Sequence, residues 1–256
     1  MVLYSNYPEE ELINSVTYFP MSLEDAEHFL LDADLGDGWL HPRASNYTFV
    51  MELHSDKGKG LAVYKPQLGE APLWDFPQGS LYLRECATYE FSKALKWEII
   101  PPTIRREGEA GIGSLQLFIP NDPNSNYFTF FEDHKEKLLQ LAVLDVLLNN
   151  ADRKGGHCLL ATNGEIWAID NGLTFHVQHK LRTVIWDFAG VVIPHNLVKD
   201  MKNVYRNLKK HEEKSIMNCF LTTDEINALL DRLSNYINHP MLPFPMSRKD
   251  LPWPVV

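Results

Sequence analysis

The stretch from Leu138 to Leu148 is apolar on nearly every side of a helix. A surface helix shows a single apolar stripe, whereas a helix that is apolar all round has to be buried. We therefore expect a buried helix here. It ends at Asn149-Asn150, and a polar loop that carries Asp152 follows it. At 256 residues the chain is long enough for one large domain or for two lobes that share a cleft.

A short hairpin is predicted directly after this loop. Its strands are Cys158–Leu160 and Ile166–Ile169, joined by a turn that contains Asn163-Gly164. Asp170 follows the second strand at once. A carboxylate at the end of a buried strand must be paired, capped or bound to a metal. The following Asn171-Gly172 leaves open the simpler explanation that Asp170 only makes a turn.

The first half of the chain is predicted to be rich in strands. Alternating β-branched and aromatic residues indicate a hairpin of Tyr47–Leu53 and Leu61–Lys65, and a further strand covers Ser114–Ile119. A helix from Ser80 to about Lys96 separates these strands. Before them, residues 1–40 are expected to be an accessory lead-in with one helix, which Ser22 caps and Gly36-Asp37-Gly38 ends.

The second half is predicted to be mostly helical. Thr222 and Glu225 form a capping box that opens a helix through about Tyr236, and the proline-rich tail from His239 is expected to be extended. A polar loop at residues 121–126 places the boundary between the halves. We therefore predict a single α+β domain over residues 1–256, with a small β-rich N-lobe (1–120) and a mostly helical C-lobe (121–256).

Composition narrows the possible partners and location. The formal net charge of -10 argues against binding to nucleic acid or anionic lipid through overall positive charge. No apolar run approaches the roughly 18 residues that span a bilayer, and the first residues lack the features of a secretory signal. The three cysteines are isolated, which suggests neither disulfides nor a zinc site. We expect a cytoplasmic protein without a stable membrane anchor.

Four pieces follow one another in an order that suits phosphoryl transfer. Lys65 ends a strand, Glu85 lies on a helix, Asp152 leaves a buried helix, and Asp170 follows a hairpin. In phosphoryl transfer a lysine neutralises phosphate oxygens and a carboxylate holds that lysine. One aspartate then orients the acceptor hydroxyl and another binds Mg²⁺. Each residue alone fits a plain surface or turn position, so the prediction depends on their order.

These segments also resemble a known family. Similarity to type II phosphatidylinositol 4-kinases is carried by Gly113–Ile119, Asp152-Arg153 and Ala168–Phe175. The chain looks still more like an uncharacterised bacterial family related to the phosphatidylinositol 3-/4-kinase superfamily, through Leu73–Pro77 and Asn149–His157. The resemblance covers roughly residues 40–195. It implies a two-lobed, protein-kinase-like fold that binds ATP with Mg²⁺ or Mn²⁺.

The resemblance also implies roles for individual residues. Lys65 would reach the ATP phosphates and Glu85 would pair with it. Asp152 would be the catalytic aspartate and Asp170 a metal ligand. The remaining ATP-binding positions would be a phosphate-covering turn and a backbone segment beside the adenine: Ser45 and Asn46 in the turn, and Gln116, Leu117 and Phe118 in the segment.

The chain departs from the family pattern in three places. His157 stands where these kinases place a metal-binding asparagine, and histidine suits Mn²⁺ better than Mg²⁺. His157 could hold a metal, contact a phosphate, mark a weakened catalyst or simply bond within its loop. The first turn, residues 41–46, contains no glycine to let amides crowd the phosphates. No cysteine-rich stretch for palmitate is present, which weakens a lipid acceptor more than it weakens ATP binding.

Three functions therefore compete. The leading hypothesis is a phosphotransferase that moves the γ-phosphoryl of ATP to a hydroxyl of an unknown protein, lipid or small molecule. A pseudokinase that binds nucleotide without transfer is the second, and transfer of AMP on the same fold is the third. The sequence indicates neither the acceptor nor the oligomeric state.

Overall fold

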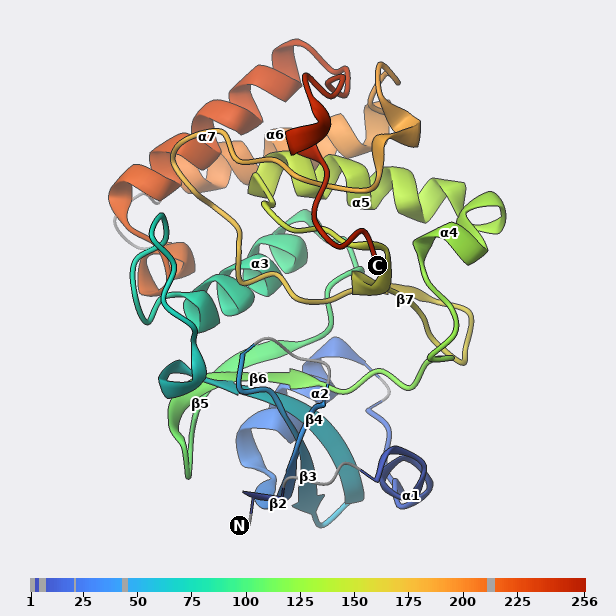
Figure 1. The fold of residues 1–256 in the computed structure, drawn as a ribbon. Helices are drawn as coiled ribbons and strands as arrows, with labels where there is room; N and C mark the ends of the chain where they lie inside the picture. Colours follow the sequence, from blue (N-terminus) through green and yellow to red (C-terminus); the bar gives the residue numbers. More distant parts are fainter. Residues whose placement is uncertain (1–2, 5–7, 21, 43–45, 211–214) are drawn as a thin grey trace. The chain divides into compact units, whose positions relative to one another are not determined.

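The computed structural model describes residues 3–4, 8–20, 22–42, 46–210 and 215–256 (Figure 1). The chain divides into two compact units. Unit 1 contains residues 1–86 and 101–120, and unit 2 contains residues 87–100 and 121–256. The division passes through helix α3 (Leu81–Leu95), whose first residues up to Cys86 belong to unit 1.

Unit 1 is built on a sheet that has six strands among the described residues, in the order β1-β2-β3-β4-β6-β5. β1 runs parallel to β2, and the other neighbours are antiparallel. The strands are β1 (Leu3–Tyr4), β2 (Asp34–Leu40), β3 (Phe49–Ser55), β4 (Gly58–Pro66), β5 (Thr103–Gly108) and β6 (Gly111–Leu117). The predicted hairpin is thus present as β3 and β4, with Phe49 opposite Tyr64.

Helix α2 (Leu23–Asp32) packs on this sheet and contributes to its core. Its buried Phe29 and Leu30 lie in one apolar cluster with Met51 and Leu53 of β3. Arg106 of β5 donates hydrogen bonds to the Leu30 and Ala33 carbonyls at the end of the helix. A cation at this position satisfies carbonyls that have no partner within the helix.

The start of the chain differs from the expected lead-in. The Ser22 side chain caps α2 by accepting from the Asp25 N–H at 3.1 Å, as predicted. The helix ends at Asp32, however, and the Gly36-Asp37-Gly38 stretch is part of β2. Two residues between Leu35 and Gly38 break the pairing register with β3, which lets a glycine-rich stretch continue as strand. Helix α1 (Glu9–Asn14) precedes it.

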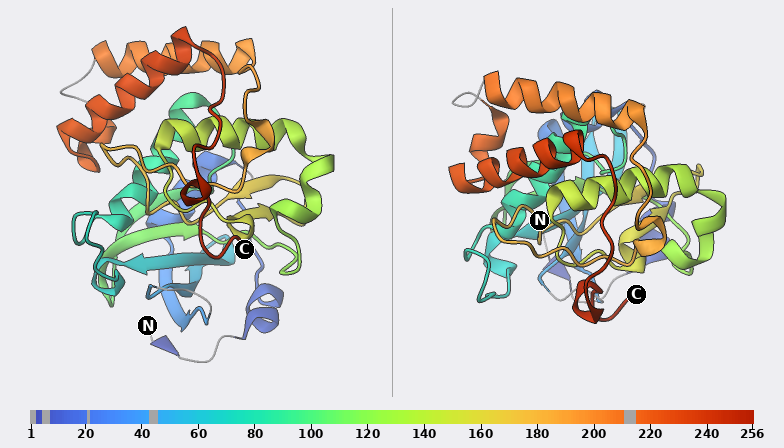
Figure 2. Two further views of the ribbon diagram at one scale, coloured as in Figure 1. Left: turned by 45° about the horizontal axis from the view of Figure 1, so that its top comes forward. Right: turned by 90° about the horizontal axis from the view of Figure 1, so that it is seen from above.

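Unit 2 is mainly helical and surrounds the predicted buried helix, α5 (Lys135–Leu148). Nine residues of α5 are buried, including every residue from Leu141 to Leu148. The other helices are α4 (Tyr127–Phe130), α6 (His195–Lys210) and α7 (Thr223–Asn238). α6 and α7 lie side by side in all views (Figure 2). Thr222 and Glu225 form the predicted capping box of α7.

A small two-stranded sheet completes unit 2. It consists of β7 (Cys158–Leu160) and β8 (Ile166–Ala168), the hairpin predicted from the sequence. The Ala168 N–H donates to the Ile99 carbonyl at 2.7 Å, which ties β8 to the segment after α3. None of the described helices is long and apolar enough to cross a membrane. The architecture is α+β, with a β-rich first unit and a helical second unit, as the sequence predicts.

Gly113 offers a test of how tightly β4 and β6 pack. A Cβ atom at this position would lie 2.4 Å from the Lys65 carbonyl oxygen and 2.8 Å from the Pro66 Cα. Both atoms are backbone and cannot move without disturbing the pairing. We expect Gly113→Ala to lower the free energy of unfolding by about 1–3 kcal/mol in urea denaturation. Gly156→Ala is the matched control, since its Cβ would meet only an atom at 4.0 Å. Equal stability of the two variants would contradict this packing.

Candidate active site

Lys65 and Glu85 form an ion pair within unit 1. The Lys65 ammonium contacts Glu85 Oε1, and the two side chains are 21% and 3% exposed. A carboxylate this deeply buried is costly unless a cation accompanies it. The pair fixes the lysine head group while leaving part of it accessible. The two residues that the sequence predicts to act together on ATP phosphates are therefore in contact.

Strand and helix register explain this contact. Lys65 lies opposite Ser114 in the pairing of β4 with β6, one residue before Pro66 ends the strand. α3 begins at Leu81, and the Glu70 carboxylate accepts its first N–H groups, from Leu81 at 3.1 Å and Tyr82 at 2.8 Å. An acidic side chain at a helix N-terminus satisfies orphan donors and complements the dipole. Glu70 thereby fixes the first turn of α3, and Glu85 follows in the next turn.

The phosphate-covering turn is only partly described. Ser45 lies outside the described residues. Asn46 is described, and its side-chain oxygen accepts the Ala71 N–H at 2.8 Å. The Tyr47 N–H beside it donates to the Gly69 carbonyl at 3.1 Å. Asn46 therefore ties the start of β3 to the segment after β4, and contact with a phosphate stays a prediction.

The predicted adenine-binding segment lies at the end of β6. The Gln116 side chain is buried and donates to the Thr103 hydroxyl at 2.8 Å. The N–H groups of Leu117 and Phe118 donate to the carbonyls of Pro102 and Leu61, at 2.8 and 3.1 Å. These two donors are thus engaged within unit 1. An adenine at this segment would have to bond to other groups, a point that the sequence could not reveal.

In unit 2, Asp152 lies four residues beyond the end of α5. Asn149 ends the helix in a left-handed conformation (φ 54°), a position that asparagine tolerates well. The Asn150 side chain then accepts the Asp152 N–H at 2.9 Å. Lys154 Nζ lies 3.0 Å from Asp152 Oδ2. Burial raises the pKa of Asp152 above its ordinary value, and the Lys154 ammonium opposes this shift.

Asp170 and His157 are also close to each other. His157 Nε2 lies 3.3 Å from Asp170 Oδ2, and the Ile169 N–H donates to the His157 carbonyl at 3.0 Å. Asp170 has a positive φ of 58°, an uncommon conformation for a residue other than glycine. Its carboxylate is half exposed. The structure therefore brings together the two residues that were predicted to hold a metal.

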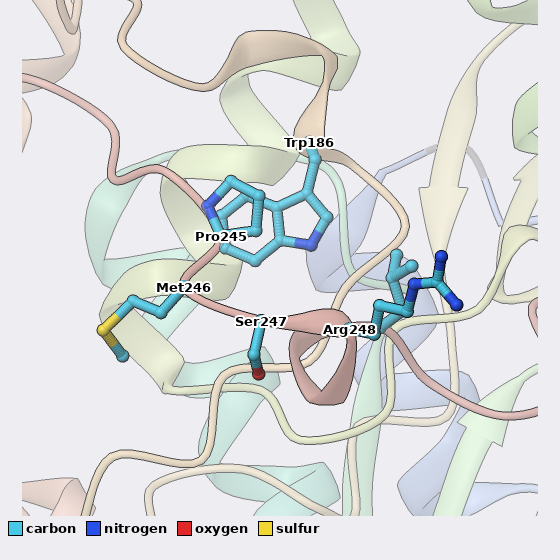
Figure 3. A pocket seen from close by; sticks show the side chains of 6 residues that line it. Trp186, Pro245, Met246, Ser247 and Arg248 are labelled. Atoms are coloured by element: carbon cyan, nitrogen blue, oxygen red, sulfur yellow. The ribbon is translucent and has the colours of Figure 1, made fainter.

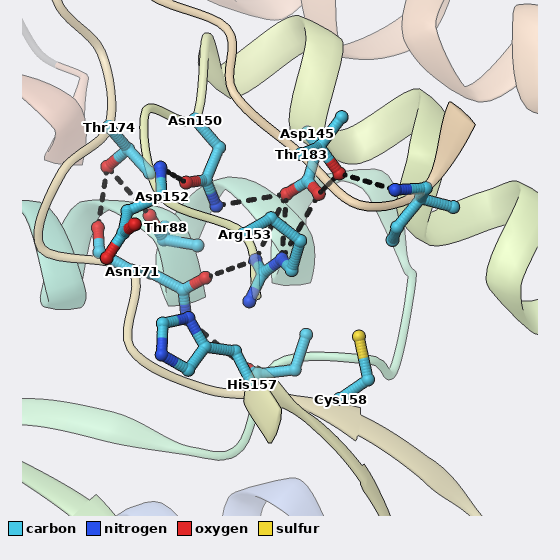
Figure 4. A network of polar contacts seen from close by, with 12 residues as sticks. Thr88, Asp145, Asn150, Asp152, Arg153, His157, Cys158, Asn171, Thr174 and Thr183 are labelled. Atoms are coloured by element: carbon cyan, nitrogen blue, oxygen red, sulfur yellow. Dashed lines mark hydrogen bonds and ion pairs between the residues drawn. The ribbon is translucent and has the colours of Figure 1, made fainter. Parts of the chain in front are cut away.

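A buried network of polar contacts holds these two loops (Figure 4). Arg153 and Asp145 are fully buried, and the Arg153 guanidinium contacts both oxygens of Asp145 at 3.0 to 3.2 Å. Arg153 also donates to the Ile169 carbonyl and to the Asn171 side chain, both at 2.7 Å. The residue after Asp152 thus binds the residues on either side of Asp170. Burial acts to lower the pKa of Arg153, but Asp145, Cys158 and Asp170 together outweigh it and the net shift is upward.

Asp145 has further partners in this network. Asn150 Nδ2 donates to Asp145 Oδ1 at 3.0 Å, and the Thr183 hydroxyl donates to Oδ2 at 3.4 Å. Sequence reasoning missed Asp145 and gave Arg153 no role beyond its place in the family resemblance. A signal was present, because Asp145 is the one charged residue in the stretch Leu138–Leu148. A charge in a helix that is buried on every side requires a partner in the core.

The residues near Asp170 fit a divalent cation whose remaining ligands are phosphate oxygens and water. Mg²⁺ usually binds through one or two carboxylates and substrate phosphates, and retains several waters. Among the described residues, no three His, Cys, Asp or Glu side chains form a preformed metal cluster. The half-exposed Asp170 carboxylate supplies a suitable oxygen, and the His157 imidazole adds a nitrogen that suits Mn²⁺.

Solved structures with a similar fold are kinase-like. A proinflammatory kinase of Helicobacter pylori, CtkA, superposes with a TM-score of 0.50, at 10% identity over 82% of this chain and 94% of that one. Fam20 from hydra, solved with sugar, also gives 0.50, at 13% identity over 86% and 90%. At such low identity the likeness concerns the fold. The chain therefore has a protein-kinase-like fold with a β-rich N-lobe and a helical C-lobe.

Sequence comparison identifies the family. The profile of the phosphatidylinositol 3- and 4-kinase family matches residues 82–234, which is more than half of the chain. The chain belongs to this family. It is also 35% identical over 270 residues to Protein Rv2133c of Mycobacterium tuberculosis, a match that covers 91% of this chain and 97% of that protein.

The buried pair allows a sharp test of its contribution to stability. Asp145→Asn leaves the Arg153 charge in the core without its counter-charge, so we expect a loss of about 3–5 kcal/mol in the free energy of unfolding. Replacing both residues, as Asp145→Leu with Arg153→Met, removes both charges and should cost less than the single change. Urea denaturation measures the difference. A double variant less stable than Asp145→Asn would contradict this account.

Proposed function

We propose that the chain is an ATP-dependent phosphotransferase that moves the γ-phosphoryl group to a hydroxyl acceptor. Two ion contacts carry this proposal, of which the sequence predicted only the first. Lys65 meets Glu85 in unit 1, and Asp170 meets His157 beside Asp152 in unit 2. Membership of the phosphatidylinositol 3- and 4-kinase family supports the same chemistry. The acceptor is a protein, a lipid or a small molecule.

Each residue has a defined task in this proposal. Lys65, held by Glu85, binds phosphate oxygens and offsets their charge. Asp152 accepts the proton of the acceptor hydroxyl, whose oxygen forms the new bond to phosphorus as the bond to the ADP oxygen breaks. Asp170 and His157 would hold Mg²⁺ or Mn²⁺, which supplies further neutralisation of phosphate charge when bound. Arg153 hydrogen-bonds to the residues on either side of Asp170 and so holds the loops of Asp152 and Asp170 together.

The raised pKa of Asp152 is consistent with a proton acceptor. General bases work best when their pKa lies near the working pH, and burial is a common way to raise it. Burial raises the pKa of Asp152 in this way. The adjacent Lys154 ammonium opposes the rise in the Asp152 pKa and favours the ionised carboxylate, which is the form that accepts a proton.

Asp152→Asn tests the catalytic assignment. Transfer from γ-labelled ATP, measured with cell extract as the source of acceptor, should fall about 100-fold or more because the proton acceptor is lost. The control is Asp56→Asn, a change of the same type in an exposed turn. Nucleotide binding, measured by thermal shift, should remain in both variants. Equal transfer by Asp152→Asn and the control would refute the assignment.

The pH dependence of transfer tests the role of Lys154. The ionised carboxylate is the active form, so activity is lost as pH falls through the pKa of Asp152. Lys154 lowers this pKa, and its removal in Lys154→Met should therefore move the acidic limb of kcat to higher pH. Lys154→Arg keeps the charge and should leave the limb in place. A limb that does not move in Lys154→Met would argue against Asp152 as the titrating group.

The contact between His157 and Asp170 keeps a second function in view. If His157 stays bonded to the Asp170 carboxylate and keeps a metal from binding there, the chain would bind nucleotide without transfer, as a pseudokinase. That function predicts stabilisation by ATP, about 2.7 kcal/mol at a hundredfold excess over Kd, with no labelled product. AMP transfer is separated from both by comparing α- and γ-labelled ATP. Absence of any thermal shift with nucleotide and metal would refute all three.

A further inference from the structure

The last residues of the chain contact the loop that carries Asp152. We call residues His239–Val256, which follow α7, the tail. The Gly155 N–H donates a hydrogen bond to the Val255 carbonyl at 2.7 Å. A Cβ atom on Gly156 would lie 4.0 Å from the Val256 side chain. The end of the chain is drawn beside β7, which this loop precedes (Figure 1). Two residues of the tail therefore cover the centre of the loop between Asp152 and His157.

A second contact ties the tail to the buried network. The Asp250 carbonyl accepts hydrogen bonds from the Thr183 N–H at 3.0 Å and from the Trp186 indole at 3.2 Å. Thr183 is paired with Arg153 in a β-bridge, and its hydroxyl bonds to Asp145. Thr183 thus joins the tail to the Asp145–Arg153 ion pair.

Between its contacts the tail has a defined course. Near its start, Leu242 exchanges backbone hydrogen bonds with residues 190 and 191, each at 3.0 Å. Further on, the Asp250 carboxylate accepts the N–H groups of Met246 and Ser247 and closes a turn. Figure 3 shows the tail passing Trp186, where it lines a cavity of about 380 Å³. The sequence predicts an extended tail, and the structure adds a short turn at Arg248–Asp250 and hydrogen bonds to the rest of unit 2 at three points.

The loop has a physical need for an external support. Gly155 and Gly156 are adjacent, and glycine loses more conformational freedom on ordering than any other residue. Gly155 is also sterically required. A Cβ there would lie 2.8 Å from the Phe128 ring and 3.3 Å from the Val255 carbonyl oxygen. Only glycine at position 155 lets the tail approach this closely. Because the two glycines make the loop flexible, the hydrogen bond from the tail is what restricts it.

We propose that the tail segment 252–256 is a positioning element for the catalytic loop. Its Val255 carbonyl fixes Gly155, and this restricts the loop to the conformation in which Asp152 and His157 are held at its two ends. The segment does not touch the reacting groups. Its effect on catalysis rests on the proposed phosphotransferase function, but its effect on the loop does not.

Deletion of residues 253–256 tests the proposal. Amide hydrogen exchange in the absence of nucleotide should show a protected Gly155 amide in the full chain, and exchange about tenfold faster after the deletion. Transfer activity should show kcat lowered by about tenfold or more, while KM for ATP stays within about twofold. A merely structural loss would not divide kcat from KM in this way. The control is Met246→Ala, a change at an 80% exposed tail side chain away from Gly155.

The outcomes separate the two proposals. An unprotected Gly155 amide in the full chain, or exchange unchanged by the deletion, overturns the positioning role. Faster exchange with unchanged kcat overturns its catalytic consequence. A full chain without any transfer activity refutes the proposed function, and the exchange data then decide the positioning role alone. If the deletion variant does not fold, as judged by its thermal unfolding, protection of Gly155 in the full chain still decides whether the tail holds the loop.

Discussion

The buried ion pair between Asp145 and Arg153 is the interaction on which unit 2 depends most directly. Both side chains are fully buried, so neither charge can be solvated by water. Two charges in a core are tolerated only when they satisfy each other and their remaining donors and acceptors. Here the remaining donors of Arg153 bind the Ile169 carbonyl and the Asn171 side chain. The cost of burying the charge is thereby coupled to the placement of the loops that carry Asp152 and Asp170.

Unit 1 solves a similar problem with a different construction. Glu85 is buried on α3 and accessible Lys65 ends a strand, so the pair holds one charge in place and leaves the other in reach. Rigid backbone supports it from both sides. Gly113 allows β6 to approach the backbone of Lys65 and Pro66 closely, and Glu70 satisfies the first donors of α3. In each unit, then, a charged residue with a proposed chemical task is oriented by a neighbour that is itself fixed by packing or hydrogen bonds.

The extent to which the sequence predicts this structure depends on the range of the interactions. The β3–β4 hairpin, α3, α5, the β7–β8 hairpin and the capped α7 are all signalled by residues close together in the chain. Strand β5 and the entry of residues 34–40 into the sheet were not predicted. Thr103–Gly108 lacks a clear alternation, and Gly36-Asp37-Gly38 looks locally like a break. Pairing with a partner strand overrides such local preferences.

The same division applies to the candidate site. Lys65, Glu85, Asp152 and Asp170 could be selected because their order along the chain matches the needs of phosphoryl transfer. The partners of these residues could not be selected in this way, since they come from distant segments. Three such contacts join distant segments. The Leu117 and Phe118 N–H groups bond to Pro102 and Leu61, Asn46 bonds to Ala71, and Val255 supports Gly155.

The sequence by itself determined the class of fold, the order of the charged residues and the helices and hairpins that local patterns mark. Periodicity, turn residues and capping pairs act over a few positions, and a linear pattern records them. Only the tertiary structure decided that Arg153 is the partner of Asp145, that the tail returns to the loop that carries Asp152, and that the Leu117 and Phe118 N–H groups bond within unit 1. These outcomes depend on which distant groups meet in the core, where an unsatisfied charge or donor carries a high free-energy cost.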